Sequence, residues 1–340
     1  MQEVKDITII GAGPTGLFGA FYAGMRGASC CVIDNLDQVG GQLTALYPEK
    51  YIFDVAGIPK VLAKDLVKAM AEQAFQFKAP VHLGQKVTGL ERASGNGPPV
   101  FTLVTTEAAY PSRTVVIAGG IGAFTPRKLP LKDVDRWYGK GLLDRILDPQ
   151  VLRGKRVLLV GGGDSAFDWA VNLQGVAQSI VMIHRRDGFR AHAATVQQVR
   201  GLCAAGKMEL RTFWELKAIH GAEAIEAVTI VDTKTKREER LPIDSVVPQL
   251  GFVSSLGPIA EWGLDIEQGE IRVSQTMATN IPGIFAAGDI TTYPGKLKLI
   301  ATGAAEAAIA VNHAVHFINP AAKVAPGHSS NMAIFGQSDD

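Results

Sequence analysis

A glycine-rich turn near the start of the chain constrains the fold more than any other feature of the sequence. Apolar residues over 7–10 predict a buried strand, and the glycine-rich turn over 11–16 follows it directly. A helical stretch then runs to about Arg26, and a second apolar strand over 30–33 ends at Asp34. Strand, glycine turn, helix and strand form one βαβ unit, so the sequence predicts an α/β fold on a parallel sheet.

The glycine spacing in this turn fits a site for the pyrophosphate of a dinucleotide. Gly11 permits the tight turn, Gly13 lets the backbone approach the phosphates, and Gly16 lets the helix pack against the strand. The helix N-terminus adds N–H donors and a favourable dipole. Asp34 can accept hydrogen bonds from an adenosine ribose at the end of the second strand. We therefore predict a dinucleotide site here.

The same order of elements recurs later in the chain. Residues 156–160 predict a strand, and the turn over 161–166 has glycine at its first and third positions and alanine at its last. A helix continues over 167–173, and the next strand is predicted over 179–183. The chain therefore holds two dinucleotide-binding units rather than a short-period repeat.

The second unit ends in cations where the first has an acid. His184, Arg185 and Arg186 close its second strand, and Arg190 follows shortly after. A carboxylate would repel a ribose 2′-phosphate, whereas guanidinium groups bind it in a bidentate manner. Because these cations stand where the first unit has its acid, the sequence predicts a preference for NADPH over NADH. The alternative interpretation is a solvated basic turn.

Other elements are shorter and less regular. Further strands are predicted over 86–92, 100–107, 114–118, 227–232, 245–247 and 283–287. A turn is expected at 94–99, a break over 249–251, and a helix of small residues over 300–317. The charged stretch 233–240 is interpreted as a solvated hairpin tip.

These positions predict two domains, one inserted into the other. The first domain is expected to be discontinuous, over 1–118 and 252–340, and the second is expected over 119–251. Each is expected to be a doubly wound, Rossmann-like unit. Glycines lie where the chain passes from one predicted domain to the other, at Gly119–Gly120 and at Gly251, and their conformational freedom suits a hinge.

Composition excludes several partners and compartments. The 34 basic and 33 acidic residues give a net charge of +1, which argues against nucleic acid or an anionic membrane. No apolar run approaches the roughly 20 residues of a membrane helix. The mixed charge of the first residues does not fit a secretory signal, and the three cysteines have no framework spacing. A cytoplasmic protein with reduced thiols is expected.

Cysteine and histidine positions exclude two kinds of centre. Cys30 and Cys31 are adjacent in an apolar strand and are expected in the core, and Cys203 stands alone in a helical stretch. No pair is spaced to relay electrons as a dithiol. The histidines at 82, 220, 313 and 316 have no metal-ligand spacing and are expected to be structural. We predict no metal site.

Several strings, taken together, resemble one family over nearly the whole chain. They lie at 40–43, 46–51, 122–127, 161–165, 184–192, 251–258, 283–289 and 327–330. The string ending at Gly288 and Asp289 is similar to the second FAD motif of the two-dinucleotide-binding flavoprotein superfamily. Within it, the chain resembles the ferredoxin–NADP reductases of the thioredoxin-reductase-like type.

The resemblance implies a set of cofactor contacts. For FAD, in the first domain, it implies contacts from Gly11, Gly13, Thr15, Gly16, Asp34, Gln42, Tyr47, Val87, Phe124, Asp289 and Ser330. For NADP, in the inserted domain, it implies contacts from Gly161, Gly163, Ser165, His184, Arg185, Arg186 and Arg190. Tyr47 and His328 are expected to stack on the two flavin faces, and no residue is expected to act as acid, base or nucleophile.

The resemblance also implies an activity and an assembly. The expected reaction moves electrons between NADPH and ferredoxin or flavodoxin through FAD, in a homodimer whose tail crosses to the partner's flavin. Two rival functions are an NADPH oxidase or diaphorase and a redox-sensing flavoprotein without turnover. The chain departs from the family pattern over 142–144, at Ala304–Ala305 and over 331–335, and the first two bear on the nicotinamide and flavin pockets.

Overall fold

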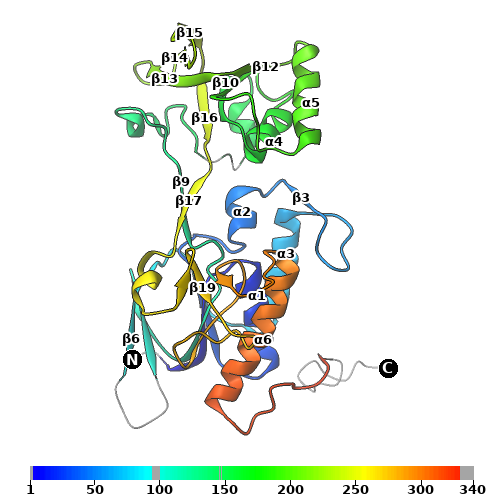
Figure 1. Ribbon diagram of the computed structural model, residues 1–340, viewed down its shortest axis with the longest axis vertical. Coiled ribbons are helices and arrows are strands. Elements are labelled where there is room, and N and C mark those ends of the chain that lie inside the picture. Colours follow the sequence, from blue (N-terminus) through cyan, green and yellow to red (C-terminus); the bar gives the residue numbers. More distant parts are fainter. Residues whose placement is uncertain (1–2, 94–99, 145, 147, 330–340) are drawn as a thin grey trace. The chain divides into compact units, whose positions relative to one another are not determined.

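The computed structural model describes residues 3–93, 100–144, 146 and 148–329, without the side chains of 123–126 and 252–254. It divides into two compact units, residues 1–124 with 254–340 and residues 125–253 (Figure 1). The sequence places these divisions after residues 118 and 251. The expected turn at 94–99 lies outside the described residues.

The first unit is built on one seven-stranded sheet of mixed direction. Its strands, in spatial order, are β5 (Val81–His82), β2 (Cys30–Ile33), β1 (Lys5–Ile10), β8 (Ala109–Ile117), β7 (Phe101–Thr105) and β6 (Val87–Arg92), with β20 (Ile284–Ala286) also beside β8. The pairs among β5, β2, β1, β8 and β20 are parallel, and β8, β7 and β6 form an antiparallel meander. Continuous apolar strands suit the centre of this sheet because both of its faces are covered.

Three helices pack in the first unit. They are α1 (Pro14–Met25), α3 (Ala63–Ala74) and α6 (Ile300–Ile318), and α1 contacts both of the others. The predicted unit of strand, turn, helix and strand is confirmed as β1, α1 and β2, with β1 parallel to β2. Short elements complete the unit: α2 (Gln42–Leu46), β3 (Tyr51–Ile52), β4 (Val61–Leu62), η1 (Phe75–Phe77), η4 (Gly257–Glu261), β18 (Ile266–Glu267), β19 (Glu270–Arg272) and β21 (Thr291–Thr292).

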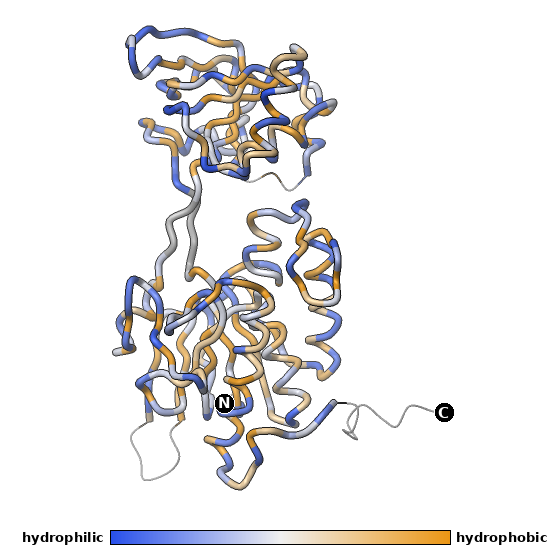
Figure 2. Tube along the Cα trace, turned by 45° about the vertical axis from the view of Figure 1, so that its right-hand side comes forward, coloured by the Kyte–Doolittle hydropathy of each residue, from blue (hydrophilic) through white to orange (hydrophobic). Residues whose placement is uncertain are grey.

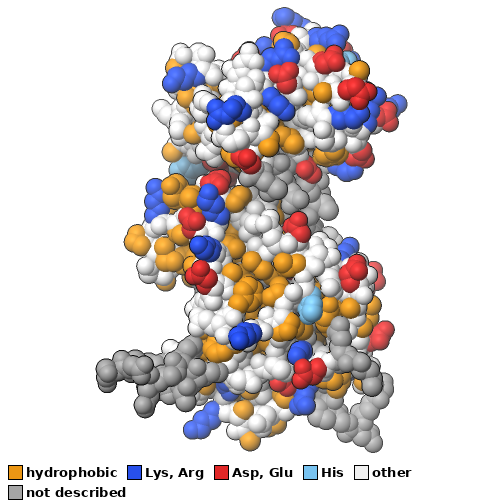
Figure 3. All heavy atoms as spheres, turned by 180° about the vertical axis from the view of Figure 1, so that it is seen from behind, with side chains coloured by type: hydrophobic (Ala, Val, Ile, Leu, Met, Phe, Trp, Pro, Cys, Tyr) orange, Lys and Arg blue, Asp and Glu red, His pale blue; other side chains and the backbone are white. Residues whose placement is uncertain are grey.

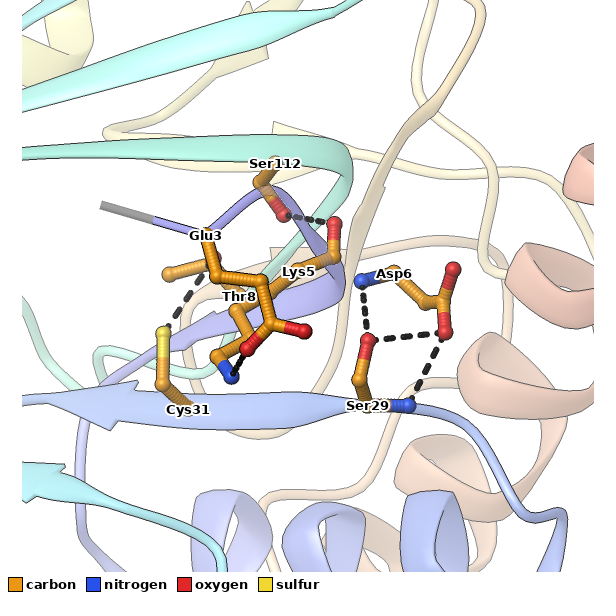
Figure 4. A network of polar contacts seen from close by, with 7 residues as sticks. All are labelled: Glu3, Lys5, Asp6, Thr8, Ser29, Cys31 and Ser112. Atoms are coloured by element: carbon orange, nitrogen blue, oxygen red, sulfur yellow. Dashed lines mark hydrogen bonds and ion pairs between the residues drawn. The ribbon is translucent and has the colours of Figure 1, made fainter. Parts of the chain in front are cut away.

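Polar contacts fix the start of the two central strands. The Asp6 carboxylate accepts hydrogen bonds from the Ser29 amide at 2.9 Å and from the Ser29 hydroxyl at 2.8 Å (Figure 4). Further along, the Thr8 hydroxyl lies 3.4 Å from the Cys31 sulfur. The parallel register is therefore set by side chains as well as by the strand ladder.

The second unit has three layers. A parallel sheet contains β12 (Glu209–Thr212), β11 (Ser179–His184), β10 (Arg156–Gly161) and β16 (Ser245–Gln249) in that order. An antiparallel sheet contains β13 (Trp214–His220), β14 (Ala227–Asp232) and β15 (Glu238–Pro242). The remaining elements are helices α4 (Asp164–Asn172) and α5 (Ala193–Ala204) and two short helices, η2 (Val134–Trp137) and η3 (Pro149–Leu152). Two strands that pair with each other, β9 (Ala123–Pro126) and β17 (Phe252–Ser255), contain the two divisions between the units.

Alternate residues of β10 supply the two cores of this unit. Leu158 and Val160 pack with the antiparallel sheet, whereas Val157 and Leu159 pack with the helices. A period of two is what a strand buried on both faces requires. The predicted break over 249–251 is confirmed at Leu250 and Gly251, whereas Gln249 still pairs with Gly161 at the end of β16.

Hydropathy and charge follow the same organisation. In Figure 2, hydrophobic segments run through the middle of each unit and hydrophilic segments lie mostly at its outer loops. On the face drawn in Figure 3, Lys and Arg side chains are interspersed with Asp and Glu side chains, as the net charge of +1 leads one to expect. The stretch 233–237 forms the turn between β14 and β15, so the hairpin is confirmed, but its tip is shorter than the predicted 233–240 because residues 238–240 belong to β15.

Candidate functional site

A cavity of about 680 Å³ opens in the first unit at the carboxyl ends of its parallel strands. Ligands of open α/β sheets bind at this edge. Eight of the eleven residues expected to contact FAD line the cavity: Gly11, Gly13, Thr15, Asp34, Gln42, Tyr47, Val87 and Asp289. The structure therefore gathers at one place side chains that lie far apart in the sequence.

The first glycine turn leaves no room for side chains at two of its positions. Gly11 has a φ of +109°, and a Cβ there would lie 2.4 Å from the Ala118 carbonyl oxygen. A Cβ on Gly16 would lie 1.8 Å from the Gly11 carbonyl oxygen, so Gly16 packs the helix against the turn and does not line the cavity. Gly13 immediately precedes α1, where free backbone N–H groups suit an anion.

Asp34 connects the end of β2 to the glycine turn. Its carboxylate accepts a hydrogen bond from the Ala12 amide at 2.6 Å and another from the Leu36 amide at 2.8 Å. Burial raises the pKa of Asp34, although these two amides oppose the shift. Since Asp34 also lines the cavity, the same carboxyl group shapes the turn and faces the space beside it.

The turn after β20 brings Asp289 to the cavity from the opposite end of the sequence. Gly288 has a φ of +83°, and a Cβ there would lie 2.7 Å from the Thr15 hydroxyl. The Gly288 amide donates a hydrogen bond of 2.7 Å to the carboxylate of Glu306 on α6. The close packing of Gly288 against Thr15 and its hydrogen bond to Glu306 thus hold the neighbouring Asp289 at the wall of the cavity.

Glu306 is a site feature that the sequence analysis missed. Its side chain is buried and also accepts hydrogen bonds from Lys296 and from the Tyr293 hydroxyl, both at 2.5 Å. Burial and Glu306 raise the pKa of Tyr293 to about 12. The signal was present, because Glu306 is the one acid in the helix that the sequence predicts over 300–317.

Two expected flavin contacts come from α2. Gln42 begins this helix, and a Cβ on Gly120 would lie 3.3 Å from its side-chain nitrogen. Tyr47 follows the helix, and burial raises the pKa of its hydroxyl, with smaller contributions from Asp289 and Asp54. Tyr47 and Asp289 are thus close enough to interact electrostatically.

Three of the expected flavin contacts are not seen at this cavity among the described side chains. His328 is exposed and does not line the cavity of its own chain, Ser330 lies outside the described residues, and Phe124 is in β9, whose side chains are not described. The segment before the tail is anchored, because Arg26 donates hydrogen bonds of 2.7 Å and 3.1 Å to the carbonyls of Lys323 and Val324.

The glycine turn of the second unit is open on one side. A Cβ on Gly161 would lie 2.4 Å from the Gln249 carbonyl oxygen, whereas a Cβ on Gly163 would meet nothing within 4 Å. Gly163 immediately precedes α4, and Ser165 lies in the first turn of that helix, half-buried. This matches a turn with space above it for a phosphate.

The basic loop of the second unit follows β11. Arg185, Arg186 and Arg190 are all exposed. The His184 ring occupies the space where a Cβ on Gly162 would lie, at 2.4 Å from its Cε1. Burial and, to a lesser extent, the three arginines lower the pKa of His184, so positive charge converges on one end of β11.

None of the three cysteines lines the cavity of the first unit. Cys30 and Cys31 are buried in β2, and burial raises the pKa of both thiols. Cys203 is half-buried on α5, and burial raises its pKa as well. The prediction of core thiols in β2 is therefore confirmed.

The described residues offer neither a metal centre nor a membrane-spanning helix. Within that part of the chain, no group of His, Cys, Asp and Glu could hold a metal ion. No helix there is long and apolar enough to cross a bilayer.

Comparison with known proteins places the chain in a family. The pyridine nucleotide-disulphide oxidoreductase family matches residues 5–314. The chain belongs to this family. A Thermus thermophilus relative named ferredoxin–NADP reductase is 48% identical, with 97% of this chain and 98% of the relative covered. A Bacillus subtilis relative named ferredoxin–NADP reductase 2 is also 48% identical, with 97% of each chain covered.

Solved structures support the fold of this family member. Thioredoxin reductase from Lactococcus lactis is 25% identical, has a TM-score of 0.74, and covers 92% of this chain and 99% of its own. The resemblance found in the sequence and the expected α/β fold of two Rossmann-like units are both confirmed. This pyridine nucleotide-disulphide oxidoreductase has no pair of cysteines spaced as a dithiol relay.

Two of the departures from the family pattern differ in burial. Leu142 is buried in the core of the second unit beside Val246, so it serves packing there. Ala304 and Ala305 lie on α6, where Ala305 is exposed and Ala304 is half-buried. The third departure, over 331–335, lies outside the described residues.

Proposed function

We propose that this chain is a ferredoxin–NADP reductase that holds FAD in its first unit and NADPH in its second. The observation that carries the proposal is the contrast between two similar glycine turns. Asp34 lies beside one turn, and three arginines lie beside the other. A carboxylate suits a free ribose and guanidinium groups suit a ribose 2′-phosphate, so the two turns suit different nucleotides.

The cavity of the first unit fits a large nucleotide such as FAD. Its volume of about 680 Å³ and its glycine floor admit a pyrophosphate, while Asp34 offers acceptors to a ribose. Asp289 and Gln42 lie along the remaining wall for the flavin end. When bound, FAD supplies the exchange between a two-electron donor and a one-electron acceptor.

The residues of the chain bind and orient, and none is assigned to proton transfer or covalent catalysis. Tyr47 is proposed to cover one face of the flavin, and His328 is proposed to cover the other. Since His328 does not line the cavity of its own chain, a tail that crosses from a second copy accounts for its role. This predicts a homodimer, which light scattering at assay concentration tests, and a fully active monomer would remove the crossing tail.

The missing dithiol directs the choice of acceptor. A reductase that transfers electrons to disulfides needs a reactive thiol near the flavin, whereas the thiols of this chain are buried or half-buried and none of them lines the cavity. We therefore assign ferredoxin or flavodoxin as electron partner, and the cytoplasm as the compartment. The NADPH oxidase and the redox sensor remain rivals, and rapid transfer to ferredoxin separates them from this proposal.

The nucleotide assignment is tested on the purified protein. We expect one FAD per chain, identified after release by chromatography and mass spectrometry. Isothermal titration should show that NADP⁺ binds more tightly than NAD⁺. Finding FMN or no flavin would refute the proposal, whereas anaerobic reduction of ferredoxin by NADPH tests the reaction itself.

A further inference from the structure

The basic loop after β11 has to keep a fixed backbone if its arginines are to meet a phosphate. Two hydrogen bonds tie this loop to the second glycine turn. The Arg190 amide donates to the Gly162 carbonyl at 2.9 Å, and the His192 amide donates to the carboxylate of Asp164 at 2.9 Å. The loop is thus anchored at its far end, beyond Arg185 and Arg186.

Aromatic packing holds the other side of the loop. The rings of Phe189 and His184 lie 5.5 Å apart, and the rings of Phe189 and Phe167 lie 4.8 Å apart. Phe167 is fully buried in α4, so the loop rests on the helix that follows the glycine turn. Of these contacts to the turn and α4, the bond to Asp164 is the one made by an exposed, charged side chain.

Asp164 occupies a position where an acid opposes phosphate binding. It is the first residue of α4, and it follows Gly163, above which the turn is open. A carboxylate there is favourable for the helix dipole but repels a pyrophosphate. If Asp164 only stabilised the helix, its charge would weaken NADP⁺ and NAD⁺ binding alike.

We propose that Asp164 is a positioning residue for coenzyme selectivity, an inference that rests on the proposed use of NADPH. Its carboxylate accepts a hydrogen bond from the His192 amide and so holds the loop that carries the arginines in a fixed position beside the glycine turn. A coenzyme with a 2′-phosphate needs the arginines in that position, whereas NAD⁺ has no 2′-phosphate for them to bind. Asp164 therefore acts through Arg185 and Arg186 and does not itself contact the coenzyme.

The test combines two substitutions at Asp164 with a background that lacks Arg185 and Arg186. Asp164→Ala removes the acceptor, and Asp164→Asn keeps an oxygen that accepts from the His192 amide. Each is made in the wild type and in Arg185→Ala/Arg186→Ala. Dissociation constants of NADP⁺, NAD⁺ and 2′,5′-ADP are measured by isothermal titration on the flavin-loaded protein, alongside kcat/KM with NADPH and NADH.

Asp164→Ala should weaken NADP⁺ and 2′,5′-ADP by about tenfold while leaving NAD⁺ unchanged or slightly tighter. Asp164→Asn should restore most of the preference. In the background that lacks Arg185 and Arg186, Asp164→Ala should change the NADP⁺ to NAD⁺ ratio less than about twofold. Asp187→Ala is the matched control, because it removes the same charge from an exposed position of the same loop and should not lower selectivity.

An equal change in the affinity of both coenzymes on Asp164→Ala, in either direction, would overturn the inference, because it would leave only a role in the helix. So would an equal loss of preference in the background that lacks Arg185 and Arg186. A wild-type protein that binds NAD⁺ as tightly as NADP⁺ would refute the proposed function as well. A selective wild type whose Asp164→Ala variant is equally selective would refute the inference alone.

Discussion

The Asp34 carboxylate and the Ala12 amide are joined by a hydrogen bond of 2.6 Å, which ties the end of β2 to the middle of the first glycine turn. Asp34 accepts a second bond from the Leu36 amide, so it is an acceptor already fixed before any ribose arrives. A pre-positioned group loses little conformational freedom on binding. The affinity for FAD should therefore depend strongly on this one side chain.

Asp34→Ala should lower the affinity for FAD at least about tenfold and destabilise the apoprotein. The amides of Ala12 and Leu36 would lose their acceptor, at a cost of about 1–3 kcal/mol for each amide that stays buried. Fluorescence titration of apoprotein with FAD and thermal melting measure the two effects. Asp37→Ala is the control, since Asp37 is exposed and does not line the cavity.

The same carboxyl group predicts a pH dependence. Burial raises the pKa of Asp34, so it takes up a proton at a higher pH than an ordinary aspartate. The protonated form is a weaker acceptor for the ribose, and FAD affinity should fall as the pH is lowered through that pKa. Asp34→Ala should abolish this dependence, and a variant that retains it would assign the titration to another group.

Arg185→Ala combined with Arg186→Ala should reduce kcat/KM with NADPH far more than with NADH. Each lost contact to the 2′-phosphate should cost about 1.5–3 kcal/mol, because these hydrogen bonds join charged groups. Steady-state kinetics with both coenzymes measure the split. Arg200→Ala on α5 is the control, as another exposed arginine of the same unit. Equal losses with both coenzymes would show that the loop is only a solvated basic turn.

The cysteines should be dispensable for electron transfer and slow to react. Burial raises the pKa of Cys30 and Cys31, which keeps both as thiols near neutral pH. A disulfide reagent should modify Cys203 first and all three cysteines only in denaturant. The variant with all three cysteines replaced by Ala or Ser should reduce ferredoxin at the wild-type rate per flavin-loaded molecule, even if it is less stable. Loss of turnover in that folded variant would contradict the absence of a dithiol relay.

Removal of the chain from Gly327 onward should leave the fold and FAD binding in place but change the reactivity of the flavin. The anchors of Arg26 to Lys323 and Val324 precede the cut, so the end of α6 keeps its support. A proposed imidazole lid would be lost, which should alter ferredoxin reduction and speed electron leakage to oxygen. Stopped-flow reduction and oxygen consumption measure both, with His328→Ala as the matched variant. Unchanged rates would leave the tail without a role at the flavin.

Much of this arrangement could be predicted from local sequence. Each of the two βαβ units lies in one short stretch of sequence, in which the apolar strands, the glycine turn and the residues that close the second strand follow one another. The core position of Cys30 and Cys31 follows equally from an apolar strand. Such features depend on neighbours in sequence, and periodicity and glycine spacing report them directly.

Contacts between distant segments could not be predicted in this way. The bond from the Gly288 amide to Glu306 and the bond from the His192 amide to Asp164 depend on how a turn meets a helix in three dimensions. Glu306 stands out in the sequence only as an acid among small residues, and the neighbouring sequence does not indicate its hydrogen-bond partners. The extent of β16 was also misjudged, because pairing of Gln249 with Gly161 extends the strand.

The central claim is that electrons from NADPH leave this protein for a one-electron carrier and not for a disulfide or oxygen. The most direct measurement is a steady-state assay in which ferredoxin, flavodoxin, thioredoxin and oxygen are offered separately to one flavin-loaded preparation with NADPH. The account predicts rapid reduction of ferredoxin or flavodoxin, slow oxygen consumption and no thioredoxin reduction above background. Rapid reduction of thioredoxin, or NADPH oxidation that proceeds only with oxygen, would contradict it.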